Sequence, residues 1–208
     1  MPDLTQDAER SRAGKIALRN QLLTSRRSLP VTVLASAAVA TQDQILSLVR
    51  RESPAVVAAY VPVGREPGGA DLVVSLSAHV RVLLPVLLPD GDLDWADYAP
   101  PLVAGPRGLL EPGGQRLGVS AVTSANLVIV PALAVDQQGL RMGRGGGSYD
   151  RALSRLPSSG GPLVVALLHD GELVERVPAE PHDRPVHAAI TPRGGLTVFA
   201  DRPAEPTQ

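Results

Sequence analysis

The 208-residue sequence predicts an α/β fold of three layers, a mostly parallel sheet with helices on both faces, preceded by an N-terminal helical lead-in. Short continuous runs of valine, leucine and alanine recur along the chain, and such runs are typical of parallel strands buried on both faces. Segments with helical spacing stand between them, and alternating strands and helices build a parallel sheet covered on both sides. Hydrophobic residues make up 44% of the chain and aromatic residues only 2%, so aliphatic side chains must form the core.

Two helices are predicted before the first strand. Residues 4–27 carry an apolar stripe at helical spacing, with arginine and lysine over the remaining surface. Pro30 ends this helix. Residues 32–51 are rich in alanine and predict a second helix, which breaks at Pro54.

The next segments predict the first two strands of the sheet. Residues 55–61, AVVAAYV, form a short apolar run, followed by a loop at 61–69 and a helix at 70–78. Residues 80–88, VRVLLPVLL, predict a second buried strand. We expect it to end or bulge at Pro85, because proline lacks the N–H group that a sheet ladder uses.

The second half of the chain predicts the remaining strands. Residues 89–118 are rich in proline and glycine and predict a long surface loop with room for one edge strand. Further strands are expected at 127–131, 163–168, 188–191 and 196–199, with a helix at 149–156. We expect a single domain over residues 1–208, with 202–208 as a frayed tail.

The composition excludes several classes of protein. Because the chain has no cysteine, it holds no disulfide, thiolate zinc site or cysteine nucleophile. A net charge of −1 and the scarcity of aromatic residues argue against nucleic-acid binding. The charged N-terminus has no apolar signal-peptide core, and apolar runs such as 80–88 are too short to span a bilayer. We therefore expect a cytoplasmic, monomeric protein without a membrane partner.

The most informative segment is 127–153, in which a buried strand and a turn lead into Arg-Met-Gly-Arg-Gly-Gly-Gly. Glycines let the backbone approach an anion closely, and consecutive N–H groups can converge on it. Arg141 and Arg144 would add charge to a polyphosphate site, and Asp150 would ligate Mg²⁺ on the nucleotide. The alternatives are a flexible linker and, for Asp150, an acid favoured in the first turn of a helix.

Three further sets of polar residues are candidates. Lys15 and Arg19, four residues apart, share a helix face and would hold an anion between them, although a solvated basic face is the more common arrangement. Glu66 follows a buried strand and would bind a polar ligand group, unless it is a solvated surface acid. His182 and Asp183 are a weak metal signal, and a satisfied pair in a loop is the more common case.

Taken together, these segments resemble the 5-formyltetrahydrofolate cyclo-ligase family, also called 5,10-methenyltetrahydrofolate synthetase. The resemblance covers about residues 13 to 192, with its pieces in family order. They are Lys15-Ile-Ala-Leu-Arg19, Tyr60-Val-Pro-Val-Gly-Arg-Glu66, Leu88-Pro-Asp over to Trp95 and Tyr98, Gly108-Leu-Leu-Glu-Pro112, the 127–153 segment, and Val177-Pro to His182-Asp183. The central pattern, Pro-x-Leu-Ala-x-Asp followed after two residues by Gly-x-Arg-x-Gly-Arg-Gly-Gly-Gly-x-Tyr-Asp-Arg, is highly specific.

The resemblance implies an activity. Enzymes of this family close 5-formyltetrahydrofolate to 5,10-methenyltetrahydrofolate with ATP and Mg²⁺, and they release ADP and phosphate. The formyl oxygen is thought to take the γ-phosphoryl group before N10 attacks the activated carbon. Such chemistry needs positioning and charge neutralisation more than a protein nucleophile.

The resemblance also implies a role for each matched position. Arg144 and Tyr149 are expected to be catalytic, Val61 and Glu66 to bind the folate together with Arg144, Gly145, Gly146, Gly147 and Ser148, and Asp150 and Asp183 to hold the metal. The expected ATP-binding residues are Lys15, Ile16, Ala17, Leu18, Arg19, Arg141, Met142, Gly143, Arg144, Gly145, Gly146, Gly147, Ser148 and Tyr149.

The chain departs from the family pattern at three positions. Ser148 stands where an aromatic residue is usual, Val135 where phenylalanine is usual, and Asn126 where aspartate is common. Loss of an aromatic side chain at 148 would weaken packing against the nucleotide or the folate. Ser148 and Val135 therefore favour an alternative, a non-catalytic folate- or nucleotide-binding protein on the same fold.

Overall fold

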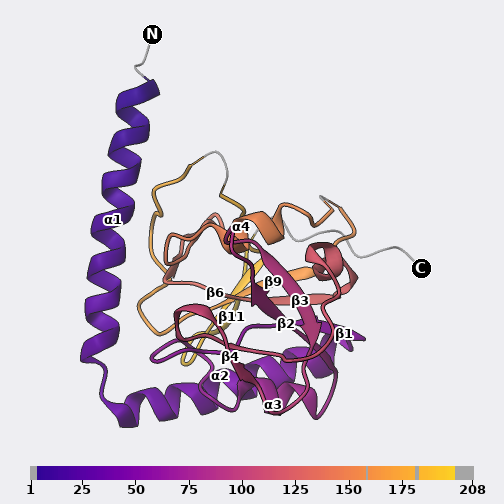
Figure 1. The fold of residues 1–208 in the computed structure, drawn as a ribbon. Helices are drawn as coiled ribbons and strands as arrows, with labels where there is room; N and C mark the ends of the chain where they lie inside the picture. Colours follow the sequence, from indigo (N-terminus) through magenta and orange to yellow (C-terminus); the bar gives the residue numbers. More distant parts are fainter. Residues whose placement is uncertain (1–3, 158, 181–182, 200–208) are drawn as a thin grey trace.

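The predicted three-layer α/β fold is confirmed by a computed structural model, which describes residues 4–157, 159–180 and 183–199 (Figure 1). Five neighbouring strands of its seven-stranded sheet run parallel, and an antiparallel strand closes each edge. The strand order is β11 (Gly195–Val198), β10 (Ala188–Thr191), β9 (Leu163–Leu167), β6 (Leu127–Pro131), β1 (Val56–Ala58), β2 (Arg81–Leu87) and β3 (Leu93–Asp97).

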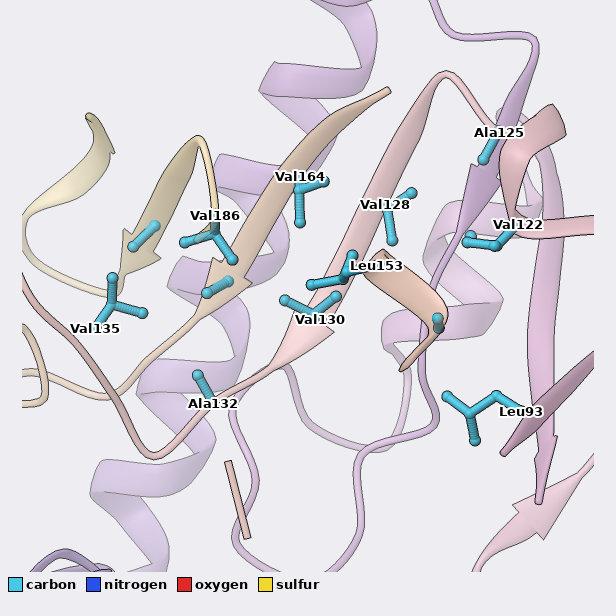
Figure 2. Packing of buried hydrophobic residues seen from close by; sticks show 14 of the residues in the cluster. Leu93, Val122, Ala125, Val128, Val130, Ala132, Val135, Leu153, Val164 and Val186 are labelled. Atoms are coloured by element: carbon cyan, nitrogen blue, oxygen red, sulfur yellow. The ribbon is translucent and has the colours of Figure 1, made fainter. Parts of the chain in front are cut away.

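Each face of the sheet buries alternate side chains, which is why the strands read as continuous apolar runs. Val57 packs under α2 (Val31–Glu52) and α3 (Leu72–Ser77), whereas the next residue, Ala58, joins the opposite cluster. Figure 2 shows that opposite cluster, where Val128 and Val164 lie near Leu153 of α4 (Ser148–Leu153). The 3₁₀ helix η2 (Val119–Ser124) covers the same face. Full burial of one such side chain stabilises the fold by roughly 1.5–3 kcal/mol.

The predicted helical lead-in is α1 (Leu4–Ser28), a long helix that meets α2 at a sharp corner (Figure 1). Pro30 stands at that corner and opens α2. Leu22 of α1 packs into a small third cluster with Leu133, Met142 and Val177. This cluster fastens α1 to the short hairpin of β7 (Ala134–Val135) and β8 (Arg141–Met142), and so beside the glycine loop.

The expectation of a long surface loop at 89–118 was wrong for most of the region, whereas the single edge strand that it allowed for is present as β3. This region contains β3, the hairpin of β4 (Val103–Ala104) and β5 (Leu110–Glu111), and the 3₁₀ turn η1 (Pro106–Gly108). Trp95 of β3 is 1% exposed and lies in the core. The sequence did not give the position of this strand, because polar Asp94 and Asp97 flank its buried residues, as an edge strand permits.

Pro85 neither ends nor distorts its strand, contrary to our expectation. It pairs with Trp95 inside β2, beyond the point where the ladder between β1 and β2 stops at Leu83. No residue of β1 pairs with β2 at Pro85, so no backbone N–H donor is needed there, and proline is tolerated.

One helix in the described part of the chain, α2, is long and apolar enough to cross a membrane by length and composition alone. Its buried residues, which include Ile45, Leu48 and Val49, pack against the sheet. A core helix passes the same test of length and hydropathy.

The strand order indicates where a ligand site is expected. β1 lies between β2, which follows it, and β6, which comes much later in the chain. In open α/β sheets ligands bind beyond the carboxyl ends of the strands, where the strand order changes direction. The loop that follows β1 carries Glu66, and the segment that follows β6 leads through the β7–β8 hairpin into the glycine loop.

Candidate active site

A cavity of about 410 Å³ lies at this edge of the sheet and gathers most of the predicted site residues. Its walls come from α1, the loop after β1, the ends of β2 and β3, the β4–β5 hairpin, the segment 131–150 and the loop before β10. The predicted residues among its lining are Lys15, Arg19, Val61, Glu66, Arg141, Met142, Gly143, Arg144, Gly145, Gly146, Gly147, Ser148, Tyr149, Asp150 and Asp183.

The glycine loop has a defined backbone conformation that packs against α1. Gly145 and Gly147 have φ values of 103° and 68°, in the left-handed region that favours glycine. Gly147 precedes the first residue of α4. Arg19 donates from Nε to the carbonyl oxygen of Gly143 at 3.1 Å, and a Cβ atom at Gly145 would come within 3.3 Å of the Arg19 guanidinium carbon. The loop is therefore folded against a cation of α1.

Arg141 brings a buried guanidinium to the cavity. It is 4% exposed, donates from Nη2 to Asp150 at 2.8 Å, and lies 5.9 Å from the centre of the Tyr149 ring. Its Nε has no hydrogen-bond partner in the described part of the chain. Because buried donors are almost always satisfied in proteins, an anion in this cavity is a fitting acceptor.

Lys15 is buried, so the solvated-face interpretation is wrong for this residue. It is 7% exposed, and its Nζ donates to Glu180 at 2.7 Å and to Asp183 at 2.7 Å and 2.9 Å. Its neighbours Ile16 and Ala17 are exposed and do not line the cavity. Leu18 packs in the third cluster beside Leu22. The nucleotide contacts expected of these three neighbours stay predictions.

Asp150 and Asp183 border the same cavity, each paired with a cation. No group of three metal-ligating side chains occurs within residues 4–157, 159–180 and 183–199. Mg²⁺ is commonly held by one or two carboxylates together with phosphates and water, so this pair fits a metal that arrives with a nucleotide. His182 lies outside the described residues.

Glu66 faces the glycine loop from the other side of the cavity. One carboxylate oxygen accepts the Val63 N–H at 2.9 Å, and the other lies 3.5 Å from Nη1 of Arg144. The Glu66 side chain is 12% exposed, so it is not a solvated surface acid, whereas Arg144 is 60% exposed. The loop after β1 and the glycine loop are thus joined by one partly exposed ion pair.

Tyr149 is a neutral phenol in this setting. Burial, and then the negative charge of Glu66, raise the pKa of Tyr149, and Arg141 opposes them only in part. The hydroxyl group stays protonated and can donate a hydrogen bond to an oxygen that gains charge. It cannot serve as a base near neutral pH.

The sequence model of the 5-formyltetrahydrofolate cyclo-ligase family matches residues 11–192. The chain belongs to this family. A 5-formyltetrahydrofolate cyclo-ligase of Mycolicibacterium smegmatis is 40% identical over 192 residues, which cover 89% of this chain and 97% of that protein. The enzyme of that name from Escherichia coli K12 is 37% identical over 119 residues, or 55% of this chain and 65% of that one.

Two solved structures share the fold. The 5,10-methenyltetrahydrofolate synthetase of Aquifex aeolicus matches with a TM-score of 0.76 and 24% identity, over 93% of this chain and 96% of that one. A synthetase of the same name from Mycoplasma pneumoniae matches with a TM-score of 0.67 and 17% identity, over 84% and 96%. The predictions of family, fold and enzyme class are confirmed.

Sequence reasoning missed a buried ion pair beneath the site of this cyclo-ligase family chain. Arg26, 5% exposed, donates to both carboxylate oxygens of Glu172 at 2.6 Å and 2.8 Å, and it also bonds the carbonyl oxygen of Ala132. Glu172 accepts the N–H of His169, whose ring nitrogen lies 2.9 Å from the carbonyl oxygen of Arg65. The network therefore ties α1 to the loops that follow β1, β6 and β9.

Of the three departures from the cyclo-ligase family pattern, one borders the cavity. Val135 is fully buried in the core, away from the cavity lining. Asn126 accepts the N–H groups of Ala55 and Val56 through Oδ1 at 2.9 Å and 3.0 Å, a task that an aspartate would also perform. Ser148 lines the cavity as the first residue of α4.

Proposed function

We propose that this chain converts 5-formyltetrahydrofolate to 5,10-methenyltetrahydrofolate, with ATP and Mg²⁺ as co-substrate and cofactor. The observation that carries the proposal is one cavity that unites a cation-lined glycine loop with an apolar wall and an acid. Lys15, Arg19, Arg141 and Arg144 supply positive charge for a polyphosphate, and Glu66 lies opposite them. Family membership supplies the substrate class.

The proposed reaction has two steps. The formyl oxygen on N5 attacks the γ-phosphorus of ATP, so an O–P bond forms and the bond to ADP breaks. N10 then attacks the activated formyl carbon, loses its proton, and phosphate leaves with the former formyl oxygen. The product is a cyclic amidinium in which the former formyl carbon joins N5 and N10 in a conjugated N–C–N system.

Both steps need charge to be held in place rather than a covalent nucleophile. The Arg144 side chain is 60% exposed, so it can contact a transferring phosphoryl group. Its Nη1 also lies 3.5 Å from Glu66, which places it beside the proposed folate-binding acid. Tyr149 is neutral near pH 7, and burial raises its pKa further, so it donates a hydrogen bond to the oxygen that gains charge. Backbone N–H groups of Gly145, Gly146 and Gly147 complete the phosphate contacts.

Asp150 and Asp183 are the residues that would hold Mg²⁺. The metal would neutralise phosphate charge and orient the γ-phosphoryl group. Their present partners, Arg141 and Lys15, would share the nucleotide phosphates with it.

We further propose that the chain acts as a single-domain monomer in the cytoplasm, without a nucleic-acid or membrane partner. The apolar helix α2 buries one face against the sheet, and this burial supports the absence of a membrane partner. The net charge of −1 supports the absence of a nucleic-acid partner.

The rival is a non-catalytic binder of folate or nucleotide, favoured by Ser148 at the cavity wall. Purified protein mixed with 5-formyltetrahydrofolate, Mg²⁺ and ATP should develop the near-ultraviolet absorbance of the conjugated product. Calorimetric folate binding with no absorbance change and no ADP release, in a folded sample at high concentration, would establish the binder instead.

A further inference from the structure

The hairpin of β4 and β5 carries an arginine in a conformation that arginine rarely adopts. Arg107 has φ 57° and ψ 24°, and Gly108 after it has φ 75°. The Leu109 N–H donates to the Pro106 carbonyl oxygen at 3.1 Å across these two residues. Successive left-handed residues form the type I′ turn, whose first central position favours asparagine, aspartate or glycine. Arginine at that position is strained and contributes nothing to the turn itself.

Arg107 also lines the active-site cavity. It makes no hydrogen bond or ion pair within the described part of the chain, unlike Lys15, Arg19 and Arg141. The hairpin is anchored at its base, because Glu111 accepts the Leu87 N–H at 2.9 Å and so fastens β5 to the end of β2. A strained, unpaired cation on an anchored turn indicates a functional position.

The wall beside this turn is apolar. Pro85, Leu87, Leu93 and Leu109 line the cavity from β2, β3 and the hairpin itself. The other cations of the cavity belong to α1 and to the segment that carries the glycine loop. In the proposed function these cations bind the phosphates of ATP. The hairpin end therefore suits a ligand part with a flat apolar ring followed by carboxylates.

We propose that Arg107 binds the glutamate carboxylates of the folate, with the aminobenzoyl ring against the apolar wall. This inference rests on the proposed function, since it assigns a second end of the same substrate. An arginine pairs with carboxylates through its planar fork, and each further γ-linked glutamate would bring another carboxylate to it. Arg107 thus sets the preference for the length of the folate tail.

The test compares Arg107→Asn with wild type and with Arg107→Lys. Arg176→Asn is the matched control, because Arg176 is an exposed arginine outside the cavity lining. KM is measured for ATP and for 5-formyltetrahydrofolate carrying one or three glutamates, and melting temperature is recorded for each variant. Asparagine fits the left-handed turn, so Arg107→Asn should melt about 2 °C higher than wild type.

Arg107→Asn should raise KM for the monoglutamate about fivefold and for the triglutamate by more, with KM for ATP within twofold of wild type. Arg107→Lys should recover part of the loss. A rise in stability together with a fall in folate affinity cannot come from a purely structural role. Unchanged folate KM values, or a loss confined to ATP, would overturn the proposal for Arg107 while wild-type turnover still supports the reaction. Wild-type protein without any folate turnover would instead overturn the proposed function, and Arg107 with it.

Discussion

Replacing Arg144 by alanine should remove most of the activity of this chain and almost none of its stability. The Arg144 side chain is 60% exposed, and its ion pair with Glu66 spans 3.5 Å. Exposed ion pairs of this kind contribute about 0–1 kcal/mol, so the free energy of unfolding should change by less than about 1 kcal/mol. Loss of one donor to a transferring group typically costs about 3 kcal/mol of transition-state stabilisation, or roughly a hundredfold in kcat.

The assay follows product absorbance at saturating ATP and folate, and urea unfolding is measured on the same preparation. Arg193→Ala is the matched control, because Arg193 is 86% exposed and pairs with Asp170 at 3.0 Å outside the active-site cavity. It should lose similar stability and no activity. If Arg144→Ala unfolds the protein, or loses activity only in proportion to the unfolded fraction, Arg144 is structural and its catalytic assignment is wrong.

Three further replacements concern Lys15, Arg26 and Asp92. Lys15→Ala should raise KM for ATP about tenfold. It should also lower the melting temperature, because two carboxylates lose their cation. An unchanged KM for ATP would leave Lys15 with a structural role alone. Arg26→Ala should lower the free energy of unfolding in urea by about 3–5 kcal/mol, since it strands the Glu172 carboxylate in the interior; a loss below about 1 kcal/mol would contradict the burial. For Asp92, burial raises the pKa, but hydrogen bonds from Arg155 and from the Leu93 N–H outweigh it and hold the pKa below its usual value. The ionised form of Asp92 therefore stabilises the fold above about pH 4. The free energy of unfolding of wild type should exceed that of Asp92→Asn by about 1 kcal/mol at pH 7, and this difference should vanish as the pH falls below about 4. A difference in unfolding free energy that is the same at about pH 3 would show that the pKa of Asp92 is not lowered.

The fold could be predicted wherever burial left a clear pattern in the chain. β1, β6 and β9 are buried on both faces, so their sequences are unbroken apolar runs. β3 could not be found in this way, because an edge strand keeps polar residues such as Asp94 and Asp97 around its buried Trp95. Pro85 was misjudged because its effect depends on where the neighbouring strand β1 ends, which the local sequence does not contain.

The candidate site was predictable where residue types cluster in sequence. The glycine loop could be recognised by its composition. The spacing of Lys15 and Arg19 alone favoured a solvated face, and only the resemblance to the family marked them as site residues. Both the loop and the pair line the cavity. The pair of Arg26 and Glu172 joins positions 146 residues apart, and nothing distinguishes Arg26 from its exposed neighbour Arg27 in the sequence. Arg107 stands in a segment that read as surface loop, so only the turn geometry singles it out.

In the proposed reaction the formyl oxygen takes the γ-phosphoryl group in the cavity beneath the glycine loop. This transfer is tested most directly with 5-formyltetrahydrofolate labelled with ¹⁸O in the formyl group, incubated with the protein, Mg²⁺ and ATP. Mass spectrometry of the released phosphate should find one labelled oxygen for each methenyl product formed. Product accompanied by unlabelled phosphate would contradict the claim, because the formyl oxygen would then have left by another route.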